Sequence, residues 1–229
     1  MARRSDRVRR LLRPAWDRCV LVIVPAPSKI VCVGRNYPAH AAELGHAVPE
    51  HPLLFLKPPS SLIGNGEPII LPQESDRVDH EAEVGVVVGR RLRHAAPSEA
   101  EAGIGAFVCL NDVTARDLQR SDGQWTRAKG FDTFCPVSAP VRDVTDWRGL
   151  EVVCRVNGQE RQRGRVEDMH FAIPDLVAYI SGIMTLEPGD IVATGTPAGV
   201  APLADGDTVE VEVSGVGILT NPVMVERGR

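Results

Sequence analysis

The sequence predicts a strand-rich protein of the mixed α/β class. Short apolar segments, each bounded by Gly, Pro or Asp, outnumber the segments with helical periodicity. The chain has 229 residues, of which 43% are hydrophobic and 24% charged, so it is long enough to bury a sizeable core. No linker or low-complexity stretch follows Pro14, which indicates one main domain.

The predicted elements alternate along the chain. Strands are expected at residues 29–34, 52–57, 69–71, 84–89, 151–157, 190–194 and 208–213, and a further apolar run lies at 107–110. Helices are expected at residues 38–44, 98–102, 116–120 and 173–183. The last helix has amphipathic spacing and carries Pro174 at an early position, where a helix tolerates proline.

The charge distribution separates the start of the chain from the rest. Residues 1–13 are rich in arginine although the net charge is −4, so the remainder is distinctly acidic, which argues against a nucleic-acid partner. An arginine-rich start is compatible with a nucleic-acid or membrane tail, but without interleaved aromatic residues a solvated extension is favoured. We therefore predict an N-terminal extension of residues 1–28, partly disordered or forming an edge strand, and a main domain of residues 29–229.

The number and spacing of the cysteines and the length of the early apolar run indicate the cellular compartment of the protein. The five cysteines form no C-x-x-C pair, and an odd number of this kind indicates buried thiols in a reducing environment. The apolar run 19–24 ends at Pro25 and is too short for a membrane helix or a signal-peptide core. We expect a cytoplasmic protein with no membrane partner.

Three carboxylates stand at the ends of apolar runs. Glu81 and Glu83 lie one residue apart at the head of the run 84–88, and Asp112 closes the run 107–110. Side chains two residues apart in a strand point to the same face, so the two glutamates should place their charges together. Such oxygen ligands suit Mg²⁺, Mn²⁺ or Ca²⁺. The alternative is a solvent-facing glutamate pair on an edge strand, but the apolar flanks favour a buried strand that ends in a cleft.

Six sequence blocks together carry a family resemblance. They are VGRNYPAH (33–40), FLKP (55–58), HEAEVGVV (80–87), NDVTARD (111–117), AKGFD (128–132) and TGTPAGV (194–200). With these blocks in this order, residues 29–225 resemble the fumarylacetoacetate hydrolase family, and in particular its short single-domain branch of acylpyruvate hydrolases and oxaloacetate decarboxylases. The resemblance makes residues 29–229 a catalytic domain.

The resemblance implies a fold, a cofactor and a substrate class. The fold would be a rolled mixed β-sandwich with few short helices, and members are usually homodimers. One Mg²⁺ or Mn²⁺ per subunit would be held by Glu81, Glu83 and Asp112, in agreement with the pattern of charges. The substrates of the family are 2-oxo acids, whose carboxylate and keto oxygens chelate the metal so that it stabilises an enolate as a carbon–carbon bond breaks.

His40 and Glu43 lie three residues apart and would share one face of the helix predicted at 38–44. A carboxylate beside an imidazole raises its basicity and can prepare it to activate water. From the spacing alone an incidental surface pair is the more common case. The resemblance places the segment in a lid over the metal, with His40 and Glu43 as catalytic residues and with Gly34 and Gly45 as possible hinges. His46 and His51 have no comparable place and are interpreted as solvent-facing.

Further cationic and polar residues would surround the substrate. Lys129 precedes Gly130 and Phe131, a position unusual for lysine unless it points into a cleft, and the resemblance makes it a catalytic residue near the metal carboxylates. Arg116 could instead only pair with Asp112 or Asp117, and Thr196 could only cap its turn. The predicted substrate-binding residues are Arg35, Lys57, Arg116, Gln119 and Thr196.

Three functions remain open from the sequence. The first is metal-dependent hydrolysis of the carbon–carbon bond of acylpyruvates, with decarboxylation of oxaloacetate as a further activity. The second is isomerisation or decarboxylation of 2-hydroxymuconate-type diacids, as in a 2-hydroxyhepta-2,4-diene-1,7-dioate isomerase. The third is a binding protein with a structural Ca²⁺, which three carboxylates alone would not saturate. Fumarylacetoacetate itself is disfavoured because only the residues before 29 precede the shared region.

Overall fold

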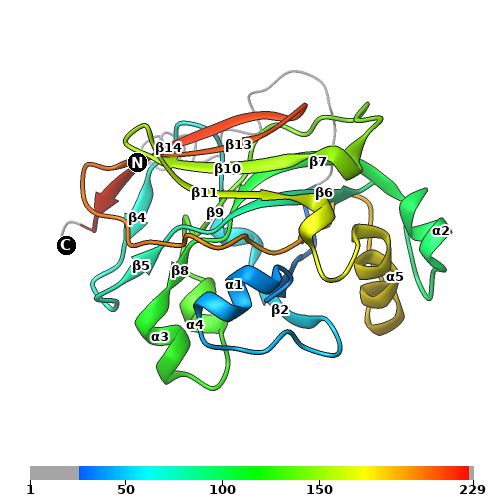
Figure 1. Cartoon of the computed structure of the whole chain (residues 1–229), viewed down its shortest axis with the longest axis horizontal. Coiled ribbons are helices and arrows are strands. Elements are labelled where there is room, and N and C mark those ends of the chain that lie inside the picture. Colours follow the sequence, from blue (N-terminus) through cyan, green and yellow to red (C-terminus); the bar gives the residue numbers. More distant parts are fainter. Residues whose placement is uncertain (1–25, 227–229) are drawn as a thin grey trace, which may run out of the picture.

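A computed structural model describes residues 26–226, so the predicted N-terminal extension lies almost entirely outside the described residues. Two five-stranded sheets form the body of the protein, with the helices below them and at one end (Figure 1). The strand-rich mixed α/β fold predicted from the sequence is confirmed. No helix among residues 26–226 is long and apolar enough to cross a membrane.

The first sheet has the strand order β2-β1-β12-β6-β7. Its strands are β1 (Ile30–Gly34), β2 (Leu53–Lys57), β6 (Ala82–Val88), β7 (Ile104–Asn111) and β12 (Ile191–Ala193). β1 runs parallel to β12, whereas β6 runs antiparallel to both β12 and β7. Every residue of β6 is buried, because its apolar side chains pack on both faces of the sheet.

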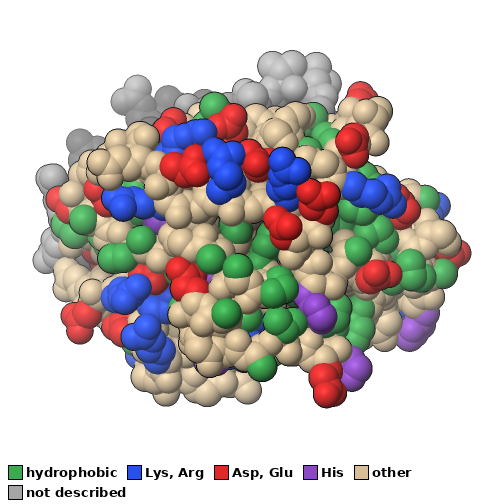
Figure 2. Space-filling view, in the orientation of Figure 1, with side chains coloured by type: hydrophobic (Ala, Val, Ile, Leu, Met, Phe, Trp, Pro, Cys, Tyr) green, Lys and Arg blue, Asp and Glu red, His purple; other side chains and the backbone are tan. Residues whose placement is uncertain are grey.

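The second sheet has the order β11-β10-β13-β14-β4. Its strands are β4 (Ile69–Leu71), β10 (Glu151–Val156), β11 (Gln159–Arg165), β13 (Thr208–Val213) and β14 (Gly217–Val225). β13 alternates between buried valines and more exposed residues, as expected of a sheet with one face in water. Acidic and basic side chains are interspersed over β10 and β11 (Figure 2), where Arg163 pairs with Glu160 and Arg155 with Glu212.

The main hydrophobic core fills the space between the two sheets. Val84 and Val86 of β6 belong to the same buried cluster as Val152 of β10 and Val211 of β13. A second buried cluster covers the other face of the first sheet, with partly buried Leu62 and Val137 packed against it. Two small strand pairs complete the fold, namely β3 (Leu62–Ile63) with β9 (Cys135–Pro136) and β5 (Val78–Asp79) with β8 (Thr114–Ala115).

Five short helices surround the sheets in the described part of the chain. They are α1 (Pro38–Glu43), α2 (Pro97–Glu101), α3 (Arg116–Ser121), α4 (Thr126–Lys129) and α5 (Ile173–Ile183). α5 buries Ile173, Leu176 and Ile180 in the main core beside Ala100 of α2. α1, α3 and α4 lie together in the lower half of the view in Figure 1, and they carry part of the site described next.

The longer predicted elements agree with the structure, whereas the strands β11 and β14, the helix α4 and the two-residue strands β3, β5, β8 and β9 were not predicted. The strand β11 was not predicted because its sequence, QERQRGR, is charged and nearly all exposed. The strand β14 was not predicted because Gly217 and Pro222 interrupt its apolar pattern, and α4 is too short to show periodicity. The four described cysteines, Cys32, Cys109, Cys135 and Cys154, are free and buried as predicted, whereas Cys19 lies outside the described residues.

Candidate active site

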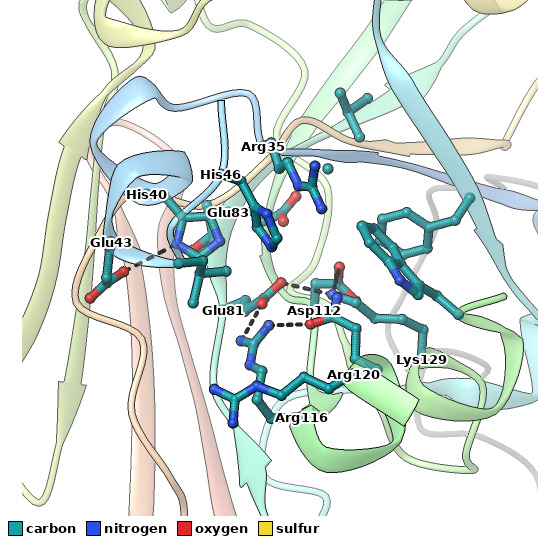
Figure 3. Close-up of a pocket in the computed structure, with 17 residues that line it drawn as sticks. Arg35, His40, Glu43, His46, Glu81, Glu83, Asp112, Arg116, Arg120 and Lys129 are labelled. Atoms are coloured by element: carbon teal, nitrogen blue, oxygen red, sulfur yellow. Dashed lines mark hydrogen bonds and ion pairs between the residues drawn. The ribbon is translucent and has the colours of Figure 1, made fainter. Parts of the chain in front are cut away.

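A cavity of about 390 Å³ opens between α1, the first sheet and α3 (Figure 3). Ten of the eleven predicted site residues line it, and they include Thr196 from the loop after β12. They are Arg35, His40, Glu43, Glu81, Glu83, Asp112, Arg116, Gln119, Lys129 and Thr196. The cavity therefore gathers residues from widely separated segments of the sequence.

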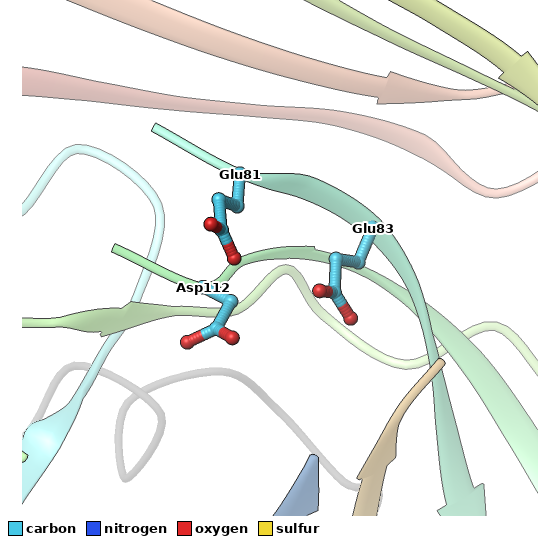
Figure 4. A group of neighbouring side chains, drawn as sticks. All are labelled: Glu81, Glu83 and Asp112. Atoms are coloured by element: carbon cyan, nitrogen blue, oxygen red, sulfur yellow. The ribbon is translucent and has the colours of Figure 1, made fainter. Parts of the chain in front are cut away.

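The three carboxylates meet at the floor of this cavity (Figure 4). One oxygen from each of Glu81, Glu83 and Asp112 lies within 4.8 Å of the others, and all three residues are buried. The geometry follows from the sheet, because β6 and β7 are antiparallel neighbours with Ala82 opposite Asn111. The backbone N–H of Asp112 also donates to the carbonyl of Glu81 at 2.8 Å, which keeps the two ligand-bearing ends side by side.

Three buried cations neutralise part of this charge. Lys129 Nζ donates to Glu81 Oε2 at 2.8 Å and to Asp112 Oδ2 at 2.6 Å, and Lys57 Nζ donates to Asp112 Oδ1 at 2.6 Å. Arg116 donates to Glu81 Oε1 at 2.5 Å, to Gln119 Oε1 at 2.6 Å and to Asp79 Oδ2 at 2.9 Å. Charge-assisted hydrogen bonds of this kind hold the carboxylates in fixed orientations.

Lys57 does not line the cavity, in contrast to its predicted place in the substrate-binding set. Its side chain is fully buried, and its ammonium group donates to Asp112 and to the carbonyl of Val113 at 3.1 Å. A lysine at the buried end of β2 therefore serves as a counter-ion for Asp112. The sequence block that contains Lys57 did not predict from which side this lysine approaches the carboxylates.

The surroundings shift the pKa values of Glu81 and Glu83 in opposite directions. Burial disfavours the charged form of Glu81, but the adjacent Lys129 and Arg116 outweigh it and hold the pKa of this carboxyl well below its usual range. Burial and the negative charges of Asp112 and Glu81 raise the pKa of Glu83 well above its usual value. Glu83 thus has no ion pair among the described residues, and a bound cation would favour its charged form.

His40 and Glu43, which were predicted to form part of a lid, line the same cavity as this cluster. His40 is 5% exposed, and its Nδ1 lies 3.2 Å from Glu43 Oε2. Both carboxylate oxygens of Glu43 accept from the backbone N–H of Gly199, at 3.0 and 3.2 Å. Glu43 therefore links the lid helix α1 to the loop 194–199 while it fixes the imidazole of His40. Gly45, which ends the lid, has a φ of 74° that favours glycine.

Thr196 has fewer free hydrogen-bonding groups than the sequence suggested. Its hydroxyl donates to the carbonyl of Ala82 at 2.9 Å and accepts from Gln162 Nε2 at 2.7 Å. The hydroxyl proton is thus already used within the protein. The group that Thr196 offers to a ligand is its backbone N–H, which has no partner among the described residues.

Several cavity residues were not identified from the sequence. His46 is exposed, as interpreted there, and it also lines the cavity, as do Phe55, Arg120 and Trp125. Phe55 and Trp125 stack edge to face with ring centroids 5.2 Å apart, and the Lys129 ammonium lies 4.9 Å from the Phe55 centroid. Arg120 lies four residues after Arg116 on α3, a helical spacing that points to the same face. From that spacing, Arg120 could have been predicted as a further cavity residue.

The donor set fits a hard divalent cation. Three buried carboxylates converge from rigid strand ends, and neither a thiol nor an imidazole accompanies them in the described cluster. Carboxylate oxygens of this number suit Mg²⁺ or Mn²⁺, which leave further coordination positions for water or substrate. Glu81, Glu83 and Asp112 are therefore the residues that could hold such a metal.

Comparison with known proteins agrees with the fold. Residues 29–224 match the family described as "Fumarylacetoacetate (FAA) hydrolase C-terminal". The oxaloacetate tautomerase FAHD1 of Arabidopsis thaliana is 46% identical over 195 residues, which cover 82% of this chain and 87% of that protein.

Two solved structures extend the comparison. A 5-carboxymethyl-2-hydroxymuconate delta-isomerase from Mycobacterium smegmatis is 47% identical, with a TM-score of 0.83 over 90% of this chain and 82% of that one. A fumarylpyruvate hydrolase from Pseudomonas aeruginosa, in complex with Mn²⁺ and pyruvate, is 29% identical, with a TM-score of 0.84 over 87% of this chain and 91% of that one.

The fold and the carboxylate-lined cavity thus define a class of enzymes with hydrolase, decarboxylase and isomerase members. The chain belongs to the fumarylacetoacetate hydrolase family.

Proposed function

We propose that the protein is a Mg²⁺- or Mn²⁺-dependent enzyme that cleaves the carbon–carbon bond of acylpyruvates by hydrolysis. One observation carries this proposal. The buried imidazole of His40, held by Glu43, faces the same cavity as the three carboxylates Glu81, Glu83 and Asp112. A general base for water and a metal-ligating cluster in one cavity are the two components that this hydrolysis requires.

The charge of the cavity favours an anionic substrate. Lys129 and Arg116 are already paired with carboxylates. Arg35 and Arg120 also line the cavity, and neither has an ion-pair partner within residues 26–226. A divalent cation on the carboxylates would make the cavity more positive still, so a substrate with one or two carboxylate groups would be attracted to it.

The protein groups have distinct tasks in the proposed reaction. Glu43 holds Nδ1 of His40, which leaves Nε2 free to take a proton as water adds to the acyl carbonyl carbon. The electrons of the broken carbon–carbon bond pass to the pyruvate half, which is then protonated, so the products are a carboxylic acid and pyruvate. Lys129, Arg116 and Gln119 would orient the 2-oxo acid end. A bound Mg²⁺ or Mn²⁺ would supply Lewis-acid polarisation of the oxo acid oxygens.

A second candidate is enol chemistry on a diacid without an attacking water. Tautomerisation or decarboxylation of oxaloacetate, or isomerisation of a 2-hydroxymuconate-type diacid, belongs to this group. It is favoured by the 46% and 47% identity to proteins with tautomerase and isomerase names, against 29% to the fumarylpyruvate hydrolase. Arg35 and Arg120, which have no ion-pair partner among the described residues, suit the second carboxylate of such a substrate.

The two candidates are separated by the variant His40→Ala. Purified wild type with Mg²⁺ is incubated in parallel with acetylpyruvate, with release of pyruvate measured, and with oxaloacetate, with keto–enol conversion and loss of CO₂ measured. For a hydrolase, His40→Ala should lower pyruvate release by ~100-fold or more and should affect the oxaloacetate reactions much less. His51→Ala is the control, because His51 is exposed and lies outside the cavity.

The outcomes decide between the candidates. Wild type that releases no pyruvate but converts oxaloacetate or a 2-hydroxymuconate-type diacid would replace the hydrolase by the second candidate. Equal losses of both activities in His40→Ala would show that His40 does not act on water alone.

A further inference from the structure

The strand β11 carries one buried polar side chain in an otherwise charged and exposed sequence. Gln162 is 1% exposed, whereas Arg161 and Arg163 on either side of it are exposed. The register of β10 and β11 shifts between Cys154 and Arg155, where Arg161 is an extra residue on β11, and this shift places Gln162 opposite Cys154. Burial of an amide is unfavourable unless its hydrogen bonds are made.

All four hydrogen bonds of the Gln162 amide connect it to the active-site region. Its Oε1 accepts from the backbone N–H of Ala82 at 3.1 Å and lies 2.8 Å from His80 Nδ1. Its Nε2 donates to Thr196 Oγ1 at 2.7 Å and to the carbonyl of Pro197 at 2.8 Å. The orientation of the amide is forced, because the Ala82 N–H can only donate and the Pro197 carbonyl can only accept.

These contacts close a ring around the backbone of one residue, Ala82. Ala82 donates to Gln162, Gln162 donates to Thr196, and the Thr196 hydroxyl donates back to the carbonyl of Ala82 at 2.9 Å. Ala82 lies between Glu81 and Glu83, so the ring fixes the backbone from which both glutamates project. Gln162 thus connects the second sheet to the carboxylate cluster of the first.

The same ring anchors the loop that faces the lid. The residue before Thr196, Gly195, donates its N–H to Glu83 Oε2 at 2.8 Å, and Gly199 donates to Glu43. Displacement of Thr196 and Pro197 would therefore disturb one metal-ligating carboxylate and the lid contact together.

We propose that Gln162 is a positioning residue of the active site, which holds the Glu81–Glu83 backbone and the loop 194–199 in the geometry that binds the metal. This inference rests on the proposed function, because it assumes that the carboxylates bind a divalent cation. Residues that orient metal ligands typically change metal affinity by 10- to 100-fold when they are replaced.

The test is the affinity of the full chain for Mn²⁺, measured by calorimetric titration at a temperature where each variant is folded. Gln162→Met keeps the length and removes every hydrogen bond of the amide, and we expect Mn²⁺ to bind it about 10-fold or more weakly than wild type. Gln159→Met is the matched control on the same strand, where the side chain is exposed, and its affinity should equal that of wild type. Pyruvate release at saturating Mn²⁺ should also fall in Gln162→Met, because the loop loses its anchor.

A purely structural role would give a different result. It would lower the melting temperature of Gln162→Met without changing the Mn²⁺ affinity of the folded protein, and that outcome would overturn the inference. Should Gln162→Met fail to fold, Thr196→Val opens the same ring with little change of volume, and wild-type affinity in that variant would overturn the inference as well. No Mn²⁺ binding by wild type would instead overturn the proposed function, and the inference with it.

Discussion

Glu83 differs from the other two carboxylates of the cluster in its surroundings. Lys129 contacts both Glu81 and Asp112, whereas Glu83 receives one backbone hydrogen bond, from Gly195. Burial and the neighbouring negative charges raise its pKa well above the usual value of 4.5. Without a metal, the folded protein therefore favours the protonated form of this side chain.

The raised pKa of Glu83 determines how the stability of the metal-free protein changes with pH. Below pH 4.5 the carboxyl is protonated in both the folded and the unfolded states, so its stabilising contribution is fully present. As the pH rises, the unfolded state releases the proton first, and the contribution is lost until the pH passes the folded pKa. The metal-free protein should therefore lose this stability as the pH rises above 4.5.

The variant Glu83→Gln tests this expectation, since glutamine keeps an acceptor for Gly195 but has no charge. In the presence of a chelator at pH 8 it should melt a few degrees above wild type, because about 1 kcal/mol corresponds to about 2–4 °C for a chain of this length. The difference should shrink at pH 5. Thermal unfolding followed by circular dichroism measures both, and a lower melting temperature than wild type at pH 8 would contradict the assignment.

The residues of the site differ in whether their places could be predicted from the sequence. The two-residue period of strands correctly predicted that Glu81 and Glu83 would share a face, because that period is a local property of the backbone. The buried side of Lys57 and the bond of Thr196 to Ala82 could not be predicted, because each depends on a partner more than fifty residues away. For the same reason, the role inferred for Gln162 could not be predicted from the sequence.

At the scale of elements, the loop 194–199 is the part that joins metal site and lid. It follows β12, and its conformation depends on two glycines with positive φ, Gly195 at 104° and Gly199 at 103°. A Cβ on Gly199 would lie 2.0 Å from the carbonyl oxygen of Arg161 on β11. The residue must therefore be glycine for both conformational and steric reasons.

Gly199→Ala should displace this loop and break its bond to Glu43. We expect a fall in pyruvate release of ~10-fold or more, since small displacements of positioned groups have large effects on rate. Gly206→Ala is the matched control, because Gly206 also has a positive φ of 85° but has no atom within 4 Å of the added Cβ. It should lose about 1 kcal/mol of stability and keep its activity.

Steady-state assays and thermal unfolding of both glycine variants distinguish strain from loss of the lid contact. Equal activities of Gly199→Ala and Gly206→Ala would show that the loop does not hold the lid.

Sequence patterns predicted elements well where one face is apolar and poorly where packing decides. The valine-rich β6 and the amphipathic α5 were predicted because their own residues carry the pattern. The charged strand β11 forms because it pairs with β10, and that pairing lies outside its own sequence. The same strand delivers Gln162 to the site.

At the scale of the whole molecule, the site exists because distant strands are neighbours. β1 pairs with β12, so the lid that follows β1 and the loop that follows β12 leave the sheet side by side. β6 and β7 bring the carboxylates to the adjacent strand ends. No local pattern predicts this strand order, and the family resemblance implied only a rolled mixed β-sandwich with few short helices. The homodimer and the cytoplasmic location stay predictions.

The central claim is that Glu81, Glu83 and Asp112 hold a divalent metal that the reaction requires. It is tested most directly by stripping the protein with a chelator and measuring pyruvate release from acetylpyruvate as Mg²⁺ or Mn²⁺ is added back. We predict that the stripped wild type is inactive and recovers with metal, and that Asp112→Asn stays inactive at metal concentrations that saturate the wild type. Full activity of the stripped wild type, or of Asp112→Asn after exhaustive dialysis, would contradict the claim.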